Sequence, residues 1–180
     1  MKFCSRCGQA VVTEVPDGDN RPRYVCKHCN TIHYENPRIV AGCVAVYDGS
    51  ILLCKRGIEP RLGYWTVPAG FMELGEGLPE AAARETWEEA LARVEVGPLT
   101  VVVDVIKARQ VHIFFEGVMT EPVFGVGDET LETRLFKPEE IPWNDLAFPS
   151  VRIAIKHHLE CRNGARHGVR LESVPEIRFD

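Results

Sequence analysis

Carboxylates recur at short intervals between positions 70 and 92, among them Glu76 and, close together after it, Glu85, Glu88 and Glu89. On a helix, which turns by about 100° per residue, the last three share one arc of roughly 100°. Clustered carboxylates repel one another unless a cation lies between them, and ligand sets made only of oxygen suit Mg²⁺ or Mn²⁺. The spacing therefore predicts a divalent-metal site on a short helix. An acidic helix face exposed to solvent is the alternative.

Four apolar residues of this segment fall opposite the carboxylates on the same helical wheel. They are Ala83, Trp87, Ala90 and Leu91. We therefore expect one face of the helix to pack against the rest of the protein and the other face to hold the charges together. The helix is expected to begin near Pro79, because proline is favoured in the first helical turn.

Residues 70–92 resemble the Nudix box, G-x5-E-x7-R-E-U-x-E-E-x-G-U, where U is a bulky aliphatic residue. The matching residues are Gly70, Glu76, Arg84, Glu85, Glu88 and Glu89. Three residues depart from the pattern: Thr86 and Ala92 replace aliphatic residues, and Leu91 replaces the usual glycine. Glycine normally supplies the left-handed conformation that ends a helix. We therefore expect the helix to continue for about one turn, toward Gly97.

The resemblance, which covers roughly residues 37–160, implies an α/β fold with a mixed sheet between helices. It also implies Mg²⁺-dependent hydrolysis of a nucleoside diphosphate linked to another moiety. By similarity to the family, Glu85, Glu88 and Glu89 would bind Mg²⁺ (or Mn²⁺) and Glu85 would also position or deprotonate a water. Glu76 could join the metal through water. Arg84 would hold Glu85 or Glu76 in place, and an ordinary salt bridge is its alternative role.

Many Nudix enzymes use a further carboxylate outside the box, and an acidic loop after position 120 offers candidates. They are Asp128, Glu129 and Glu132, of which Glu129 and Glu132 are favoured because a strand follows or includes them. Candidate clamps for phosphate or ribose are Arg56, Arg61 and Arg109. Candidate stacking partners for a base are Phe71, Tyr64 and Phe115, although core packing is favoured for each.

A second metal-binding pattern lies at the start of the chain, where Cys4-x-x-Cys7 is followed by Cys26-x-x-Cys29. This is the spacing of a structural tetrathiolate zinc site. A redox dithiol is the alternative, but the segment is too short for a core of its own, which favours zinc. Charged residues of opposite sign nearly balance in residues 1–36. A module that reads nucleic acid normally shows a basic stripe, so we expect this one to brace the protein or to contact a second copy.

The sequence motifs favour some classes of substrate over others but do not identify a single compound. NADH pyrophosphatases carry S-Q-P-W-P-F-P-x-S shortly after the box, and residues 93–113 lack it. The stretches His33-Tyr34-Glu35-Asn36-Pro37-Arg38 and Ile141-Pro142-Trp143 resemble zinc-ribbon hydrolases that act on FAD or ADP-ribose. These substrates are therefore favoured over NADH. Nucleotide-capped RNA ends are disfavoured by the near-neutral charge of residues 1–36. A protein that only senses a nucleotide or binds nucleic acid remains the alternative outside the enzymes.

Composition is consistent with a small, soluble intracellular protein. The chain has 180 residues, 45% of them hydrophobic, and a net charge of −5. It has no apolar stretch long enough to cross a membrane, and its odd count of seven cysteines argues against a complete disulfide framework. We expect a cytoplasmic protein that binds a small nucleotide, does not bind nucleic acid or a membrane, and by its resemblance forms a homodimer.

Three segments are predicted: a zinc ribbon at 1–36, a Nudix hydrolase domain at 37–163, and an irregular tail at 164–180. Apolar runs predict strands in the second segment at 39–46, 51–55, 64–67, 99–106, 111–119 and 131–136. A last helix is predicted at about 151–161, with Ser150 as its N-terminal cap.

Overall fold

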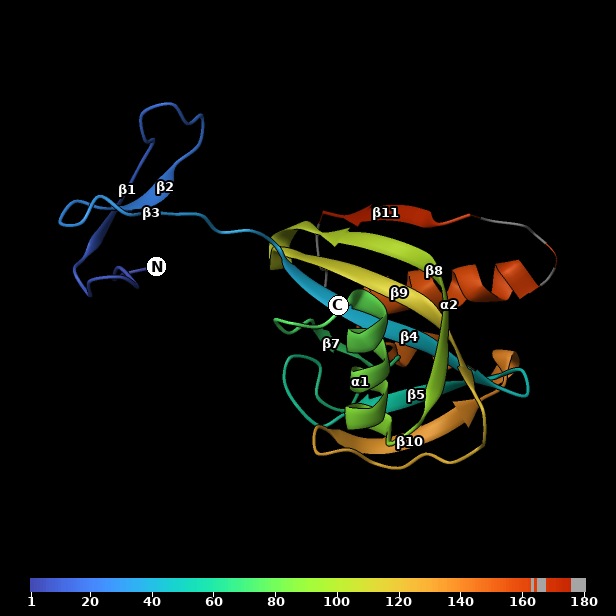
Figure 1. Cartoon of the computed structure of the whole chain (residues 1–180). Helices are drawn as coiled ribbons and strands as arrows, with labels where there is room; N and C mark the ends of the chain where they lie inside the picture. Colours follow the sequence, from blue (N-terminus) through green and yellow to red (C-terminus); the bar gives the residue numbers. More distant parts are fainter. Residues whose placement is uncertain (163, 165–167, 176–180) are drawn as a thin grey trace. The chain divides into compact units, whose positions relative to one another are not determined.

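The computed structural model describes residues 1–162, 164 and 168–175. The chain divides into two compact units, Met1–Asn36 and Pro37–Asp180 (Figure 1). No helix among the described residues is long and apolar enough to span a bilayer.

The N-terminal unit is a three-stranded antiparallel sheet built from β1 (Val11–Glu14), β2 (Arg23–Cys26) and β3 (Ile32–His33). The two Cys-x-x-Cys pairs lie in turns beside these strands. Each turn is closed by a backbone hydrogen bond: Gly8 N–H donates to Cys4 C=O, and Asn30 N–H donates to Cys26 C=O. Gly8 and Asn30 both have a positive φ, which glycine and asparagine tolerate well. The local sequence thus folds both pairs into matching turns.

The second unit is built on an eight-stranded mixed sheet, which confirms the predicted fold class. Its main path runs β10-β5-β4-β9-β8-β11, with β6 paired to β5 and β7 paired to β4. The strands are β4 (Arg38–Tyr47), β5 (Ser50–Arg56), β6 (Trp65–Thr66), β7 (Ala69–Phe71), β8 (Val94–Val105), β9 (Gln110–Met119), β10 (Thr130–Phe136) and β11 (Arg170–Val174). β4 pairs parallel with β9 and β8 pairs parallel with β11, whereas β8 and β9 are antiparallel.

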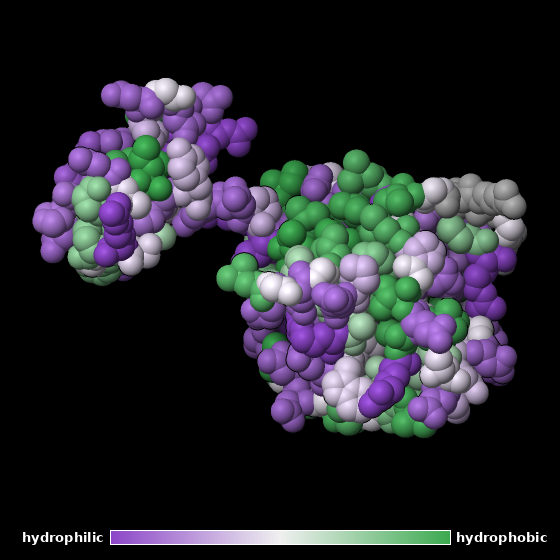
Figure 2. Space-filling view, viewed as in Figure 1, coloured by the Kyte–Doolittle hydropathy of each residue, from purple (hydrophilic) through white to green (hydrophobic). Residues whose placement is uncertain are grey.

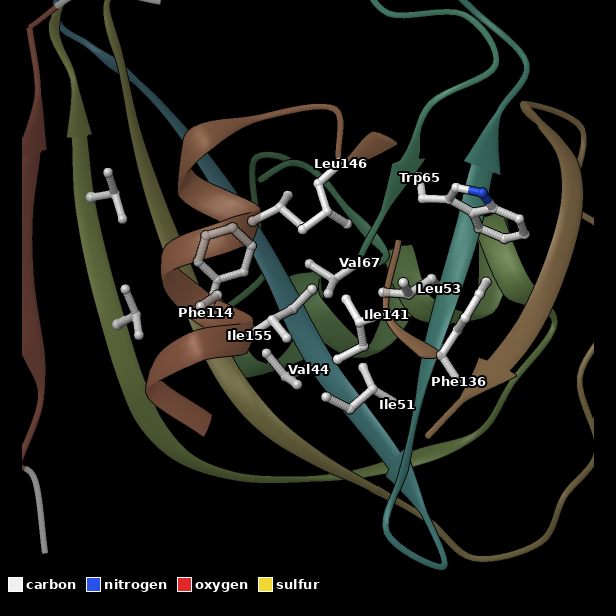
Figure 3. Close-up of a cluster of buried hydrophobic side chains, with 14 of the residues drawn as sticks. Val44, Ile51, Leu53, Trp65, Val67, Phe114, Phe136, Ile141, Leu146 and Ile155 are labelled. Carbon is white, nitrogen blue, oxygen red and sulfur yellow. The ribbon is translucent and has the colours of Figure 1, made fainter. Parts of the chain in front are cut away.

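Two helices cover opposite faces of this sheet, and the alternation of side chains along β4 shows why. Ala41 and Cys43 pack with Ala81 and Ala82 of α1 (Leu78–Ala90). Val44 points to the other face, into the main core beneath α2 (Pro149–Arg162). Figure 3 shows that core, in which Ile155 of α2, Phe114 of β9 and Val67 converge with Val44. The uninterrupted apolar run of β4 follows from its burial on both faces.

The α1 face of the sheet is only partly covered. Figure 2 shows hydrophobic side chains gathered above the helix, over β9, β8 and β11. Register places Leu171 beside Val102 and Val102 beside Ile113, in one row across these three strands. Leu171 is 70% exposed, so the outer end of this row is open to solvent.

Three predictions about these elements are wrong. The segment predicted as an irregular tail contains β11, although residues 165–167 and 176–180 lie outside the described part of the chain. β8 begins at Val94, ahead of the predicted start, because its first residues pair with the end of β9. Ser150 lies inside α2 and does not cap it, since the helix starts at Pro149 and the Ser150 hydroxyl contacts His112.

Helix α1 does not continue toward Gly97; it ends at Ala90. Leu91 adopts the left-handed conformation (φ 48°), and its N–H still donates to Trp87 C=O at 2.8 Å. A loop satisfies the last carbonyls of the helix: Gly125 N–H donates to Ala90 C=O at 2.7 Å, and Gly127 N–H donates to Glu89 C=O at 3.1 Å. These two N–H groups are the hydrogen-bond donors that an exposed helix end would otherwise find in water or in a capping residue. The left-handed turn therefore forms without glycine.

The buried face of α1 also differs from the prediction. Trp87 is 46% exposed, whereas Glu85 is only 9% exposed and Thr86 is fully buried. The face that packs against the sheet is centred on Ala82 and Glu85, so that carboxylate points into the protein. The residue types alone suggested the reverse, because carboxylates are rarely buried without a partner. The cause is a polar pocket between the helix and the sheet.

Candidate active site

Arg84 is the centre of the charged cluster. Its Nη1 donates to Glu85 Oε1 and to Glu88 Oε2, both at 2.8 Å. Its Nε and Nη2 donate to the two oxygens of Glu76, at 2.9 and 2.8 Å, and Nη2 also donates to Phe71 C=O. The Arg84 guanidinium, helped by the Glu73 N–H, lowers the pKa of Glu76 to about 2. One guanidinium thus bridges three carboxylates and ties them to the backbone of β7.

Glu85 reaches this cluster because residue 70 has no side chain. A Cβ built on Gly70 would lie 2.2 Å from Glu85 Oε2, far closer than two such atoms can approach. Gly70 pairs with Ala41 on β4, whose side chain packs under α1. Burial raises the pKa of Glu85, and Arg84 opposes that rise. Glycine at position 70 therefore makes room for the carboxylate between helix and strand.

Glu89 is the carboxylate of the cluster that lies against the start of β7. Its Oε2 accepts a hydrogen bond from Ala69 N–H at 3.1 Å. Burial raises its pKa to about 8, Glu85 and Glu129 add repulsion, and Arg56 is the cation that opposes them. A carboxylate in such surroundings stays charged at neutral pH only beside an additional cation. A divalent ion fits this set of oxygen donors, which contains no sulfur or nitrogen ligand.

A pocket of about 960 Å³ opens beside these residues. It forms where β4 leaves β5, since β4 pairs with β5 only at Val46 and Tyr47 and pairs with β7 at Val40–Gly42. Its charged lining residues are Arg56, Glu59, Glu73, Arg84, Glu85, Glu88, Glu89, Asp128 and Glu129. The box helix, the end of β5 and the acidic loop therefore meet at one cavity.

Of the candidate catalytic and phosphate-binding residues outside the box, some line the pocket and others do not. Asp128, Glu129 and Arg56 line the pocket. Glu129 is anchored there by its carbonyl, which accepts from Gly57 N–H at 2.7 Å. Glu132 does not line the pocket; it lies 3.6 Å from Lys55 Nζ with half of its side chain exposed.

The other two predicted arginines also lie outside the pocket lining. The Arg61 guanidinium lies over the Tyr64 ring at 4.4 Å, and the Arg109 carbonyl accepts from Arg38 N–H at 3.0 Å. Of the aromatic candidates, Phe71 lines the pocket and is 41% exposed. Phe115 packs in the core, as favoured.

The sequence interpretation missed three pocket or pocket-side residues: Gln110, His112 and Ser150. His112 Nδ1 lies 2.9 Å from Ser150 Oγ, and His112 Nε2 lies 2.9 Å from Gln110 Oε1. Burial lowers the pKa of His112 to about 4. The alternation of Gln110 and His112 on an apolar strand was the one available signal, because polar residues on a buried strand face need partners.

The four cysteines of the N-terminal unit come together as their spacing predicts. Their Sγ atoms all lie within 4.8 Å of one another, and within the described residues no other group of three or more potential ligands is this tight. Cys4 and Cys29 Sγ are 3.7 Å apart, and Cys7 and Cys26 Sγ are 3.5 Å apart. A tetrahedron with Zn–S bonds of about 2.3 Å has edges of about 3.8 Å. The thiols therefore fit a structural zinc ion.

Comparison with known proteins agrees with this arrangement. Residues 36–156 match the family described as NUDIX domain, and residues 2–35 match the region described as Nudix N-terminal. A NUDIX hydrolase from Nitrosomonas europaea has a similar crystal structure (TM-score 0.93, 45% identity), covering 97% of this chain and 99% of that one. The fold also resembles an ADP-ribose pyrophosphatase from Streptococcus suis, at a TM-score of 0.60 and 18% identity, over 77% of this chain and all of that one.

A curated relative is the NAD-capped RNA hydrolase NudC of Edwardsiella ictaluri, 36% identical over 97 residues. The match covers 52% of this chain and 35% of the relative, so the chain spans about a third of that protein's length. The fold and the box define the class of protein, a Nudix domain of mixed α and β structure preceded by a zinc-ribbon unit. The chain belongs to the Nudix hydrolase family.

Proposed function

We propose that this protein hydrolyses a phosphoric anhydride bond in a nucleoside diphosphate linked to another moiety. Water adds to one phosphorus, the bridging P–O bond breaks, and two monophosphates leave. The observation that carries the proposal is the convergence of Glu85, Glu88, Glu89 and Glu129 on one pocket that also holds Arg56. An anionic substrate can approach so many carboxylates only through cations.

The proposed metal ligands are Glu85, Glu88 and Glu89, with Glu76 in the surrounding shell. When bound there, Mg²⁺ or Mn²⁺ would neutralise phosphoryl oxygens and lower the pKa of a coordinated water. Arg84 holds Glu85 and Glu88 at the pocket wall and keeps Glu76 charged. Such outer contacts orient ligands and are worth about 10–100-fold in metal affinity or activity.

Glu129 is the proposed carboxylate from outside the box that accepts the proton of the attacking water. It lines the pocket, and its negative charge raises the pKa of Glu89 and opposes the lowering of the pKa of Arg56. Glu132 is the weaker candidate because its side chain pairs with Lys55. Arg56 is the proposed phosphate clamp: its Nε donates to Pro60 C=O at 2.9 Å and its guanidinium lies 5.1 Å from the Phe148 ring. These contacts fix its position before substrate arrives.

Zinc in the N-terminal unit is proposed to be structural. Two further contacts support closed coordination: His33 Nε2 lies 3.3 Å from Cys4 Sγ, and Thr31 Oγ1 lies 3.1 Å from Cys29 Sγ. Hydrogen bonds of this kind stabilise thiolates. A homodimer, expected from the family resemblance, is a further proposal, and light scattering of the purified protein tests it.

FAD and ADP-ribose are the substrates we favour within this class, on the motifs around residues 33–38 and 141–143. NADH or NAD-capped RNA is the second candidate, and the 36% identity to the NudC relative is the observation that favours it. The absence of the S-Q-P-W-P-F-P-x-S motif from residues 93–113 argues against that candidate. Nucleic-acid binding without turnover remains the non-enzymatic alternative.

A substrate panel tests the proposal. FAD, ADP-ribose, NADH, diadenosine tetraphosphate and an NAD-capped RNA are each incubated with the protein and Mg²⁺, and the products are separated. We expect one diphosphate to be cleaved far faster than the others, into a pair of monophosphates. Salt-dependent RNA binding with no Mg²⁺-dependent cleavage of any substrate would support the binding alternative instead.

A further inference from the structure

Gln110, His112 and Ser150 form a hydrogen-bonded chain at an end of the pocket that the metal chemistry does not use. Gln110 and His112 alternate along β9, so both side chains face the α2 side of the sheet and both line the pocket. Ser150 lies in the first turn of α2 and is 1% exposed. The chain therefore joins a buried helix residue to a polar group at the pocket surface.

The direction of each hydrogen bond follows from Gln110 Oε1, an amide oxygen that can only accept. It lies 2.9 Å from His112 Nε2, so Nε2 carries a proton and donates to it. Burial lowers the pKa of His112 to about 4, so the imidazole is neutral and its Nδ1 carries no proton. Nδ1 therefore accepts from the Ser150 hydroxyl at 2.9 Å. The bond from Nε2–H fixes the carbonyl end of the Gln110 amide.

One consequence concerns the other end of the amide. With Oε1 held by His112, the end of the amide that Gln110 has left for the pocket is Nε2, which carries two N–H donors. A glutamine that is free to rotate could offer either a donor or an acceptor. This one is held by its oxygen, so the amide nitrogen, a donor, is the end left for a ligand.

The register gives the spacing along β4 between the position of Gln110 and that of Ala69, the residue bound by Glu89. In the register of the sheet it is opposite Arg38 of β4, whereas Ala69, whose N–H binds Glu89, is opposite Gly42. From position 38 to position 42 a strand rises by about 13 Å, at about 3.3 Å per residue. That span is comparable with the reach from a diphosphate, across a ribose, to the edge of a base.

The pocket surface near β4 positions 38 to 42 is apolar. Val40 lies between Phe71 and His112 in the register, and all three line the pocket. A flat heterocycle can lie on such a surface, with a polar group at its edge to read it. Phe148 and Ala108 are further apolar residues of the pocket lining.

We propose that Gln110 is a specificity residue that donates a hydrogen bond to an acceptor on the heterocycle of the substrate, either a carbonyl oxygen or an unprotonated ring nitrogen. His112 and Ser150 are positioning residues that hold its amide in the donating orientation. The proposal rests on the proposed function, since it assigns one subsite of the same pocket.

The direct test is Gln110→Glu, which keeps the oxygen that accepts from His112 and replaces the donor with an acceptor. We expect KM for the best substrate of the panel to rise about 10-fold or more, with kcat within about twofold, because the contact is remote from the reacting bond. Ser150→Ala should raise KM by a smaller factor. Thr100→Val is the matched control: Thr100 does not line the pocket, its hydroxyl donates one hydrogen bond to the backbone C=O of Phe114, and loss of that bond should leave KM unchanged.

Equilibrium binding of ADP in Mg²⁺ separates this proposal from the proposed function. If the protein turns over a substrate and Gln110→Glu leaves both KM and ADP affinity unchanged, the Gln110 assignment is wrong and the proposed function stands. If no substrate is cleaved but ADP binds and Gln110→Glu weakens that binding about 10-fold, the subsite is supported and the hydrolase proposal fails. Equal ADP affinity in both proteins with no turnover overturns both.

Discussion

His112 should make the stability of the second unit depend on pH, and His112→Gln tests this. The His112 imidazole is buried between β9 and α2, and burial lowers its pKa from about 6.5 to about 4. Between these values the unfolded chain binds a proton that the folded protein does not. Stability therefore rises with pH, is complete above about 6.5, and is lost as the pH falls toward 4.

The magnitude follows from the two pKa values. Integrating the difference in proton binding from pH 7 to pH 4.5 gives about 2.5 kcal/mol for this one group. Removing the imidazole lowers the unfolding free energy by the same amount at every pH, because packing contacts and hydrogen bonds are lost. It also removes the part of the unfolding free energy that depends on pH through protonation of His112. The fall in stability from pH 7 to pH 4.5 should therefore be smaller by about 2.5 kcal/mol in His112→Gln than in the unmodified protein.

Urea unfolding, monitored by tryptophan fluorescence, reports on the second unit, which contains His112. The reason is that Trp65, Trp87 and Trp143 all belong to that unit. Every other titrating group is common to both proteins and cancels in the comparison. Parallel curves of unfolding free energy against pH for the two proteins would refute the reasoning. They would show that His112 is protonated as easily in the folded state as in the unfolded state.

Two further substitutions test the two candidate metal sites. Gly70→Ala should lower kcat/KM by about 100-fold, because the new Cβ would displace the Glu85 carboxylate. Gly97→Ala is the control, because its new Cβ would make ordinary contacts outside the pocket lining. Equal losses of kcat/KM in both variants would contradict the explanation. Cys26→Ser should abolish stoichiometric zinc, measured by elemental analysis, and lower thermal stability while the Mg²⁺-dependent chemistry is largely retained. Full zinc content in that variant would show that the ligand set is wrong.

The spacing of residues 70–92 predicted the box helix and the grouping of its carboxylates, because these relations depend on a single helix. It did not predict which face of that helix is buried. Glu85 is buried and Trp87 exposed because the acidic loop and β7 build a polar pocket beside the helix, and those segments are distant in sequence. Leu91 was misjudged for the same reason: its left-handed turn depends on hydrogen bonds from Gly125 and Gly127 to the end of the helix.

Non-local pairing explains the other omissions. β11 is a short strand that pairs in parallel with β8, and the pairing, rather than its own periodicity, makes it regular. His112 and Ser150 are 38 positions apart, and no local pattern connects a histidine on an apolar strand with a serine at the start of a helix. The cysteine pairs are the opposite case, since two local turns carry most of the information that the zinc site needs.

The central claim is that the box carboxylates support metal-dependent hydrolysis, and Glu88→Gln tests it most directly. Turnover of the best substrate is measured across a Mg²⁺ titration for the unmodified protein, for Glu88→Gln, and for Glu95→Gln as a control on an exposed residue of β8. We expect Glu88→Gln to lose most of its activity at every Mg²⁺ concentration while its thermal unfolding is unchanged, and Glu95→Gln to behave like the unmodified protein. Near-normal turnover by Glu88→Gln would contradict the metal assignment on which the account depends.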